Sequence, residues 1–320
     1  MVRIDFINVG YGDAVLLQFL SEEKDVYRVL VDCGDLDIGA KPLPSARICA
    51  ADYLSALQID TLDLVLISHL HLDHVGGLLQ VAEKVRIREL WTNYLPPEDC
   101  RNGAAFDISV KDCGARCLVK ALDTLCSALA VLKAEGCRIR CMTEKERMPL
   151  PGGERNSLEL YAPDRSLLER QKTVLDHVCH GVQDEAELHE LDLFINNTSL
   201  RAAFTSEGKT VFLPGDTYGA FLERCGCSPC DLLKVPHHGH LDGITEKLLR
   251  KMHPAHAVIS VSDDRTDDCP SAVLLDRLKR ADIAVSFTDA VCMCGIEPDP
   301  HSAVRFTLGS GGITRSYVKI

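Results

Sequence analysis

The sequence lacks the long apolar segments that membrane proteins carry. None of its hydrophobic runs approaches the roughly 18 residues that a membrane-spanning helix needs. The first residues, MVRIDF, enter a strand-like pattern at once, without the charged leader and apolar core of a signal peptide. From these two absences we expect a cytoplasmic protein with no membrane partner.

Positive charge is also scarce. The chain of 320 residues has 35 Lys and Arg against 47 Asp and Glu, which gives a formal net charge of −12. This balance argues against broad electrostatic capture of nucleic acid, because such capture needs a basic face. It does not exclude a local phosphate site, since bound dications themselves attract phosphate.

Cysteine, in contrast, is abundant. The chain has 15 cysteines, and without an export signal we expect reduced thiols. Two clusters stand out, CGCSPC at residues 225–230 and CMC at residues 292–294, but neither has zinc-ribbon spacing. Plain thiols near turns are the favoured interpretation, and a structural metal site or a disulfide is the alternative.

Short apolar runs and helical spacings alternate along the chain, in two β-rich halves. They predict an α+β fold, an αββα sandwich in which two mixed sheets lie face to face with helices on both outer sides. We expect one domain over residues 1–320, with a helical insertion at about 96–193. Strands are expected at 2–7, 14–19, 26–31, 62–67, 86–91, 199–204, 210–213, 232–235, 257–261 and 283–287, and helices at 45–57, 77–84, 110–135, 244–252 and 270–280.

The most informative segment is SHLHLDHVGG at residues 68–77, which contains three imidazoles and a carboxylate within six positions. It directly follows the apolar run 62–67, so it lies in a loop at the end of a buried strand. Imidazole and carboxylate are the ligands that zinc, iron and manganese use when water must be activated. The alternation of His69 and His71 allows both to reach one ion, while Asp73 and His74 can turn toward a second.

The second half of the chain has two comparable strand ends. Asp216 comes directly after a strand and behind Gly215, where the backbone can turn sharply. A carboxylate at this place can bridge two ions, because it has two oxygens and carries negative charge. The run VPHHG at residues 235–239 places His237 and His238 after another strand. Strand ends of this kind can converge on one edge of a β-sandwich.

The order of these motifs along the chain, from His69 to Asp216 and then His237, resembles that of the metallo-β-lactamase superfamily. The sequence also resembles the hydrolase domain of ComEC-type competence proteins in four segments, which are NVGYGDAVLL at 8–17, NTSL at 197–200, LKVPHHG at 233–239 and PAHAVISV at 254–261. The resemblance implies the αββα fold. It also implies metal-assisted hydrolysis, with phosphodiester cleavage by a nuclease as the role of the competence branch.

The resemblance further implies a ligand set for two divalent ions, zinc or manganese. His69 and His71 would bind the first ion, Asp73, His74 and His237 the second, and Asp216 both. Asp73 is also expected to orient the attacking water or accept its proton. His238 and His240 are expected to stabilise developing charge or protonate the leaving group, with a purely structural role as the alternative.

One position departs from the pattern of most superfamily members, although the competence branch itself tends to carry Asn there, and two further places depart from the pattern of that branch. Asn197 stands where most superfamily members have a third histidine for the first ion, and an amide oxygen suits a harder ion such as manganese better than zinc. The first site is therefore expected to be the looser one. The run DDCP at 267–270 replaces the usual Gly-His-Pro, and His240 replaces a Ser. The acidic residues Asp264, Asp267 and Asp268 would repel a polyanion.

These observations favour hydrolysis of a phosphodiester, in a single-stranded nucleic acid or a nucleotide. The alternatives are hydrolysis of a thioester, lactone or lactam, and a non-catalytic scaffold that retains the fold. Di-iron redox relatives generally have an acidic residue where this chain has His71, which disfavours that class. A basic band at the metal edge would indicate a nuclease, with Lys234, Arg250, Lys251, Lys279 and Arg280 as candidates, whereas an apolar pocket would indicate an ester hydrolase.

Overall fold

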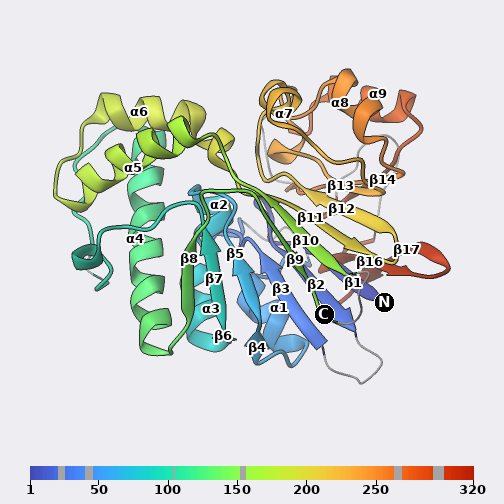
Figure 1. The fold of residues 1–320 in the computed structure, drawn as a ribbon, viewed down its shortest axis with the longest axis horizontal. Helices are drawn as coiled ribbons and strands as arrows, with labels where there is room; N and C mark the ends of the chain where they lie inside the picture. The colour runs from blue at the N-terminus through green and yellow to red at the C-terminus, as the bar shows by residue number, and fades with distance from the viewer. Residues whose placement is uncertain (21–25, 40–45, 104, 152–155, 263–268, 291–298) are drawn as a thin grey trace.

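A computed structural model describes residues 1–20, 26–39, 46–103, 105–151, 156–262, 269–290 and 299–320 (Figure 1). The acidic residues Asp264, Asp267 and Asp268 and the cysteines at 292–294, for which the sequence suggested roles, lie outside the described residues.

An 8-stranded sheet unites strands from both ends of the sequence, in the order β17-β16-β1-β2-β3-β5-β7-β8. Neighbours from β17 to β3 are antiparallel, and those from β3 to β8 are parallel, so the sheet is mixed. Its strands are β1 (Val2–Ile7), β2 (Val15–Leu20), β3 (Val26–Val31), β5 (Leu64–Leu66), β7 (Glu89–Thr92), β8 (Arg138–Cys141), β16 (Ala303–Gly309) and β17 (Gly312–Val318).

A 7-stranded sheet has the order β15-β14-β13-β12-β11-β10-β9. It is antiparallel from β9 to β12 and parallel from β12 to β15. Its strands are β9 (Glu146–Pro149), β10 (Ser157–Tyr161), β11 (Arg201–Ser206), β12 (Lys209–Leu213), β13 (Leu232–Lys234), β14 (His256–Ile259) and β15 (Ala284–Phe287). The expected hairpin across Glu207 and Gly208 is present as β11 and β12.

Three apolar cores show how the layers are stacked. One core joins the two sheets, with Phe6 and Leu17 from the first sheet and Phe204 and Leu232 from the second. A second core packs helices on the outer side of the first sheet, and a third packs helices on the outer side of the second. The layer order is therefore helix, sheet, sheet, helix, and the predicted αββα sandwich is confirmed (Figure 1).

Each outer layer has its own helices. On the first sheet these include α1 (Ala50–Ala56), α3 (Leu78–Lys84) and α4 (Cys113–Ala134), and on the second they are α7 (Gly219–Cys225), α8 (Glu246–Met252) and α9 (Ala272–Arg280). The long helix α4 confirms the helix expected at 110–135. Its first turn is capped by Asp112, whose carboxylate accepts the Ala115 N–H at 2.9 Å.

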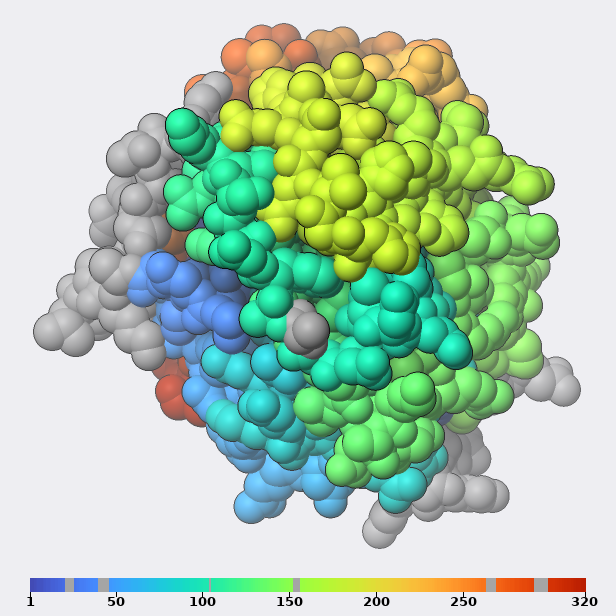
Figure 2. Space-filling view, turned by 90° about the vertical axis from the view of Figure 1, so that its left-hand side faces the viewer, coloured from blue at the N-terminus to red at the C-terminus, as the bar shows by residue number. Residues whose placement is uncertain are grey.

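The segment at about 96–193 differs in part from the helical insertion that the sequence suggested. Besides α4, it forms α5 (Arg165–Cys179) and α6 (Glu185–Phe194), but it also contributes strand β8 to the first sheet and strands β9 and β10 to the second. Figure 2 faces this side of the molecule, where the segment covers much of the surface. Strands β8 and β9 are short and have no buried residue, so their apolar pattern is weak, whereas β10 alternates regularly and buries Leu158 and Leu160.

Two expected strands are interrupted. The runs at 62–67 and 86–91 each split, and their first residues form a small separate sheet of β4 (Thr61–Leu62) and β6 (Arg86–Ile87). The break in the first run lies at Asp63, whose carboxylate accepts the Arg28 N–H at 2.8 Å and pairs with Arg88 at 3.0 Å. A side chain that bonds to neighbouring backbone in this way competes with the sheet ladder.

Parallel pairing brings the functional loops to one edge of the sandwich. β3 and β5 are parallel neighbours, and so are β12 and β13, so the carboxyl ends of each pair lie side by side. Polar residues follow all four strands at these ends. In open α/β sheets such an edge is where ligands bind. Among the described residues, no helix is long and apolar enough to cross a membrane.

Candidate metal centre

The first ligand motif is held against the strand beside it. β5 ends at Leu66, and the backbone N–H and hydroxyl of Ser68 both donate to the carboxylate of Asp32 at 2.7 Å. Asp32 directly follows β3, so two parallel strands fix the start of the loop. The chain then enters the one-turn helix α2 (Leu72–Val75), which carries Asp73 and His74.

Asp216 reaches the same edge from the second sheet. Gly215, which precedes it, has a φ of 58°, and a Cβ there would lie 2.9 Å from the side chain of Ser199. Only glycine meets both requirements without strain. The resulting turn after β12 points the Asp216 side chain into the protein, where it is 2% exposed.

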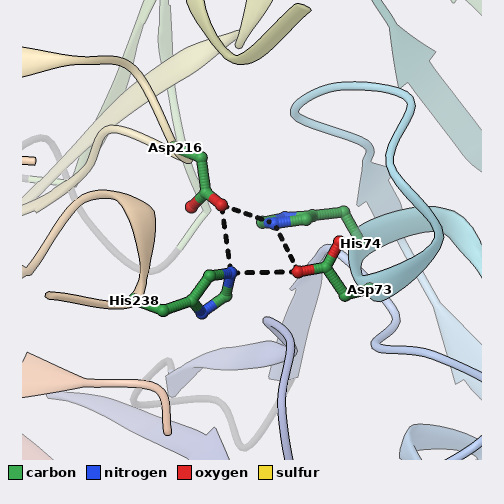
Figure 3. Close-up of side chains that lie close together, drawn as sticks. All are labelled: Asp73, His74, Asp216 and His238. Atoms are coloured by element: carbon green, nitrogen blue, oxygen red, sulfur yellow. Dashed lines mark hydrogen bonds and ion pairs between the residues drawn. The ribbon is translucent and has the colours of Figure 1, made fainter. Parts of the chain in front are cut away.

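Asp73, His74, Asp216 and His238 form what we call the inner group (Figure 3). One ligand atom from each lies within 4.8 Å of all the others. Asp216 Oδ2 is 3.2 Å from His74 Nε2 and 3.0 Å from His238 Nε2, and His238 Nε2 is 3.0 Å from Asp73 Oδ2. Three segments from both halves of the chain therefore point their donor atoms at one place.

His69 and His71 form a second arrangement, the outer pair. His69 Nε2 lies 3.1 Å from His71 Nδ1, and the rings of His69 and His74 are 4.1 Å apart. His69 is buried, whereas the His71 side chain is 21% exposed and has Asp192 Oδ1 at 3.4 Å from its Nε2. Burial and the neighbouring imidazoles hold the pKa of His69 well below its usual range, so the ring stays neutral, as a ligand must be.

The two adjacent histidines of the second half differ from the roles that the sequence suggested. His238, expected as a catalytic residue, is buried and belongs to the inner group, whereas His237, expected as a ligand, does not. The His237 ring is 20% exposed, and its Nδ1 lies 2.8 Å from Asp242. Both residues have left-handed φ angles, 50° and 49°, and their rings lie in different surroundings, that of His237 beside Asp242 and that of His238 in the inner group. His237 still contributes its backbone N–H, which donates to Asp216 Oδ1 at 3.1 Å.

Two further predicted residues lie around the inner group without belonging to it. His240 stacks its ring on that of His237, with centroids 4.4 Å apart. The amide oxygen of Asn197 accepts the Tyr218 N–H at 3.2 Å, so it is occupied by a turn of the backbone. On the same turn, Asn196 Oδ1 is buried and makes no hydrogen bond within the described part of the chain.

Charges in the inner group balance one another. Burial raises the pKa of the Asp73 and Asp216 carboxyls, but nearby imidazoles outweigh it and lower both pKa values. Burial likewise lowers the pKa of His238, but the carboxylate of Asp216 outweighs it and raises this pKa to about 9. The pKa of His74 is raised well above its usual value for the same reason. Without metal, both imidazoles therefore hold protons that a bound ion would displace.

Three buried charged residues, Asp13, Asp32 and Lys234, surround the inner group in roles that the sequence did not suggest. Asp32 Oδ2 lies 2.9 Å from His74 Nδ1 and orients that ring. Lys234 pairs with Asp13 and, at 2.8 Å, with Asp216. A signal was present for Lys234, because a lysine inside the apolar run LLKV at 232–235 has to find a buried partner.

The donor set fits a divalent metal ion. Two imidazoles and two carboxylates converge in a buried place, and both types bind zinc and manganese. His74 also has the partner that metal-binding imidazoles usually need, since Asp32 accepts from its far nitrogen. Bound there, such an ion would act as a Lewis acid.

Comparison with known families agrees with this chemistry. The family model described as "Metallo-beta-lactamase superfamily" matches residues 7–105, a segment that contains Asp13, Asp32 and all of the first ligand motif. The match supports a metallo-β-lactamase superfamily domain in this chain. No curated protein matches the chain.

Two similar solved structures are a metallo-β-lactamase and a diphosphatase. "Crystal Structure of a New Diphosphatase from the PhnP Family" has 12% sequence identity and a TM-score of 0.39, covering 81% of this chain and 86% of that one. "Rm3 metallo-beta-lactamase" has 13% identity and a TM-score of 0.35, covering 72% and 76%. The metallo-β-lactamase superfamily match and the clustered His and Asp side chains together fit a metal-dependent hydrolase.

Proposed function

We propose that this chain is a metal-dependent hydrolase that cleaves a phosphodiester, with a nucleotide or other small phosphodiester as its substrate. The observation that carries the proposal is the inner group, in which two carboxylates and two imidazoles from both halves of the chain meet in a buried place. The motifs that resemble ComEC-type competence proteins favour phosphodiesters among the possible substrates.

In this proposal the protein holds two divalent ions, zinc or manganese. The inner group binds one of them, and the outer pair binds the other, with the buried side-chain oxygen of Asn196, which makes no hydrogen bond within the described residues, as a supplementary ligand. When bound, such ions polarise a phosphoryl oxygen and lower the pKa of water toward about 7.

The side chains around the ions have separate tasks. Asp73 is 17% exposed, against 2% for Asp216, so it is the inner-group carboxylate that can meet an attacking water and accept its proton. His238 is buried and acts as a ligand. His240 protonates the leaving group in this proposal. It is half-buried and lies in the loop that carries His237 and His238, where its ring stacks on that of His237.

The surroundings favour a small substrate over a long nucleic acid. Of the residues expected to form a basic band, Lys234 is buried, and Arg250 and Arg280 pair with acidic residues on their own helices. Carboxylates lie around the site instead, Asp192 beside His71 of the outer pair and Asp242 beside His237, next to the inner-group residue His238. Bound ions attract the one phosphate that is cleaved, but carboxylates around them repel the further phosphates of a long polyanion.

One observation supports hydrolysis of a thioester, lactone or lactam as a second candidate. A cavity of about 410 Å³ adjoins His237 through its lining residues Tyr218 and Asp242, and Ala220 and Leu241 give it apolar walls. Such a cavity could hold the acyl part of an ester. A non-catalytic scaffold is disfavoured, because the inner group still contains both the imidazoles and the carboxylates that a metal site needs.

The test is to strip the protein of metal, reload it with manganese or zinc, and offer it bis-p-nitrophenyl phosphate, cyclic nucleotides, single-stranded DNA, RNA and an acyl thioester. We expect cleavage of the small phosphodiesters by the reloaded protein. Asp73→Asn should abolish it, while Asp276→Asn, a change on the surface of α9, should retain it. If neither metal restores a cleavage that Asp73→Asn lacks, the proposal is wrong, and cleavage of the thioester alone selects the second candidate.

A further inference from the structure

Lys234 is a buried cation beside the inner group, and all its donors are used. It is the last residue of β13, and its side chain is 1% exposed. The ammonium pairs with Asp13, donates to Asp216 Oδ1 at 2.8 Å and donates to the Gly215 carbonyl at 3.4 Å. Since an ammonium has three N–H groups, this set of partners satisfies it and fixes its position.

This contact makes the two oxygens of Asp216 unequal. Oδ1 accepts from Lys234 at 2.8 Å and from the His237 N–H at 3.1 Å. Oδ2 faces the inner group, at 3.2 Å from His74 Nε2 and 3.0 Å from His238 Nε2. Rotation of the carboxylate would break both contacts of Oδ1, so the arrangement holds Oδ2 toward the ligand atoms.

Lys234 also joins the two halves of the chain at this edge. Its second carboxylate, Asp13, comes from the loop between β1 and β2, and the Asp13 N–H donates to the Asp73 carbonyl at 3.0 Å. Gly12 allows that close approach, because a Cβ there would lie 2.4 Å from the same carbonyl. Lys234 is thereby anchored to the loop of Asp73 as well as to Asp216.

We propose that Lys234 is a positioning residue that presents a single oxygen of Asp216, Oδ2, to bound ions and withholds Oδ1. This inference rests on the proposed function only in treating Asp216 as a ligand. It replaces the expectation that Asp216 uses both oxygens to bridge the ions. With one oxygen on offer, Asp216 would serve an ion at the inner group, and the outer pair would hold its ion with fewer ligands.

Removal of the ammonium should therefore act on metal binding in a specific way. Lys234→Met frees Oδ1 and adds one net negative charge beside the site, so the second ion gains a ligand and an attraction. The metal-free protein should lose stability, because Asp13 and Asp216 are then buried without their cation. A bound ion should compensate for part of that loss.

The experiment measures two dissociation constants for Co²⁺ or Zn²⁺ by competition with a chelator. It adds thermal unfolding with and without metal, and the visible spectrum of the Co²⁺ protein. In the natural protein we expect the two constants to differ by at least tenfold. Lys234→Met should narrow this ratio by at least tenfold, change the Co²⁺ spectrum and increase the metal-induced rise in melting temperature.

Matched variants separate positioning from general loss of stability. Lys209→Met removes a half-exposed lysine that pairs with Asp231 near β13, and it should leave both constants unchanged. Asp13→Asn weakens the same buried cluster but leaves Lys234 on Asp216, so the ratio should stay within threefold of the natural one. Asp13→Asn keeps the proposal testable even if Lys234→Met does not fold without metal.

The proposal is overturned if Lys234→Met keeps the natural ratio and loses equal stability with and without metal, or if Asp13→Asn narrows the ratio as strongly. It is also overturned if neither the natural protein nor the variant binds an ion, since Asp216 would then not be a ligand. If ions bind as expected but no phosphodiester is cleaved, only the proposed function fails.

Discussion

The inner group and the outer pair each contain two imidazoles, but only the inner group has carboxylates, and the supports of the two differ. The inner group combines residues from both halves of the chain, and Asp32 and Lys234 hold two of its members from behind. The outer pair comes from one loop, and its more exposed member has Asp192 at 3.4 Å as its partner. Partners behind the ligands tune metal affinity. We therefore expect the inner group, whose side chains are better supported, to hold an ion more firmly than the outer pair.

The largest effect is expected when the two adjacent histidines of the second half are replaced by alanine, one at a time. His238→Ala removes an inner-group ligand, so the inner ion should be lost and hydrolysis should fall about 1,000-fold, equivalent to about 4 kcal/mol in the barrier. His237→Ala, one residue away, should stay within about threefold, or roughly 0.7 kcal/mol. Metal content and kcat/KM check both variants. The opposite ranking would return His237 to the ligand set.

The second prediction separates the two sites by pH. The pKa of His238 is raised from 6.5 to about 9 in the folded, metal-free protein, because Asp216 outweighs the effect of burial. A histidine whose pKa is raised on folding stabilises the folded state at pH values below its pKa in the unfolded chain. This contribution to the free energy of unfolding is lost as pH rises through the folded-state pKa of about 9. The loss should be about 3 kcal/mol. The pKa of His69 is lowered well below its usual value, so His69 should add no change in this window.

Urea unfolding of the metal-stripped protein across this pH range measures the effect. His238→Asn should flatten the fall, whereas His253→Asn, a change of a histidine outside both ligand sets, should preserve it. A stability that stays level or rises between about pH 6.5 and 9 in the unchanged protein contradicts the protonated state of the inner group.

The third prediction removes a support rather than a ligand. Asp32→Asn keeps the size of the side chain but removes the negative charge that orients the His74 ring through its Nδ1. The affinity of the inner ion should fall about 10- to 100-fold. The constant for the outer ion should change much less. Chelator competition measures both constants, and equal weakening of the two ions would mean that the sites do not have separate supports.

The smallest effect is expected at the outer pair. His71→Ala removes a partly exposed ligand, and the outer ion should bind about tenfold more weakly, which corresponds to about 1.4 kcal/mol. The inner ion should be unaffected. Asp192→Asn, which alters the neighbour of His71, should have a smaller effect still. Loss of both ions in His71→Ala would show that the two sites form a single unit.

The sequence predicted the parts of the fold that depend on local patterns. The strands around each motif and the helix over 110–135 follow from apolar periodicity, and all were found near their expected places. Strands β8 and β9 were not expected because they are short and have no buried residue, and β10, β16 and β17 were not predicted either. The ligand types were evident because imidazole and carboxylate cluster after strands.

The arrangement inside the site depends on contacts that a linear pattern does not contain. Which of His237 and His238 turns inward depends on two left-handed residues in succession, an unusual conformation for side chains with a Cβ. The pairing of Lys234 with Asp13 joins the two sheets, so neither residue predicts it alone. Predicting Asp32 as a support for His74 would have required the parallel pairing of β3 and β5.

The place of β16 in the first sheet has a consequence for synthesis of the chain. β16 pairs with β1, and Arg305 on β16 binds Asp5 on β1 across 300 positions of sequence. At about 5 to 20 residues per second, a ribosome leaves that side of β1 without its partner for tens of seconds. During this time the nascent chain exposes a strand edge. Chaperone cross-linking to arrested chains that end before β16, but not to complete ones, would reveal this interval.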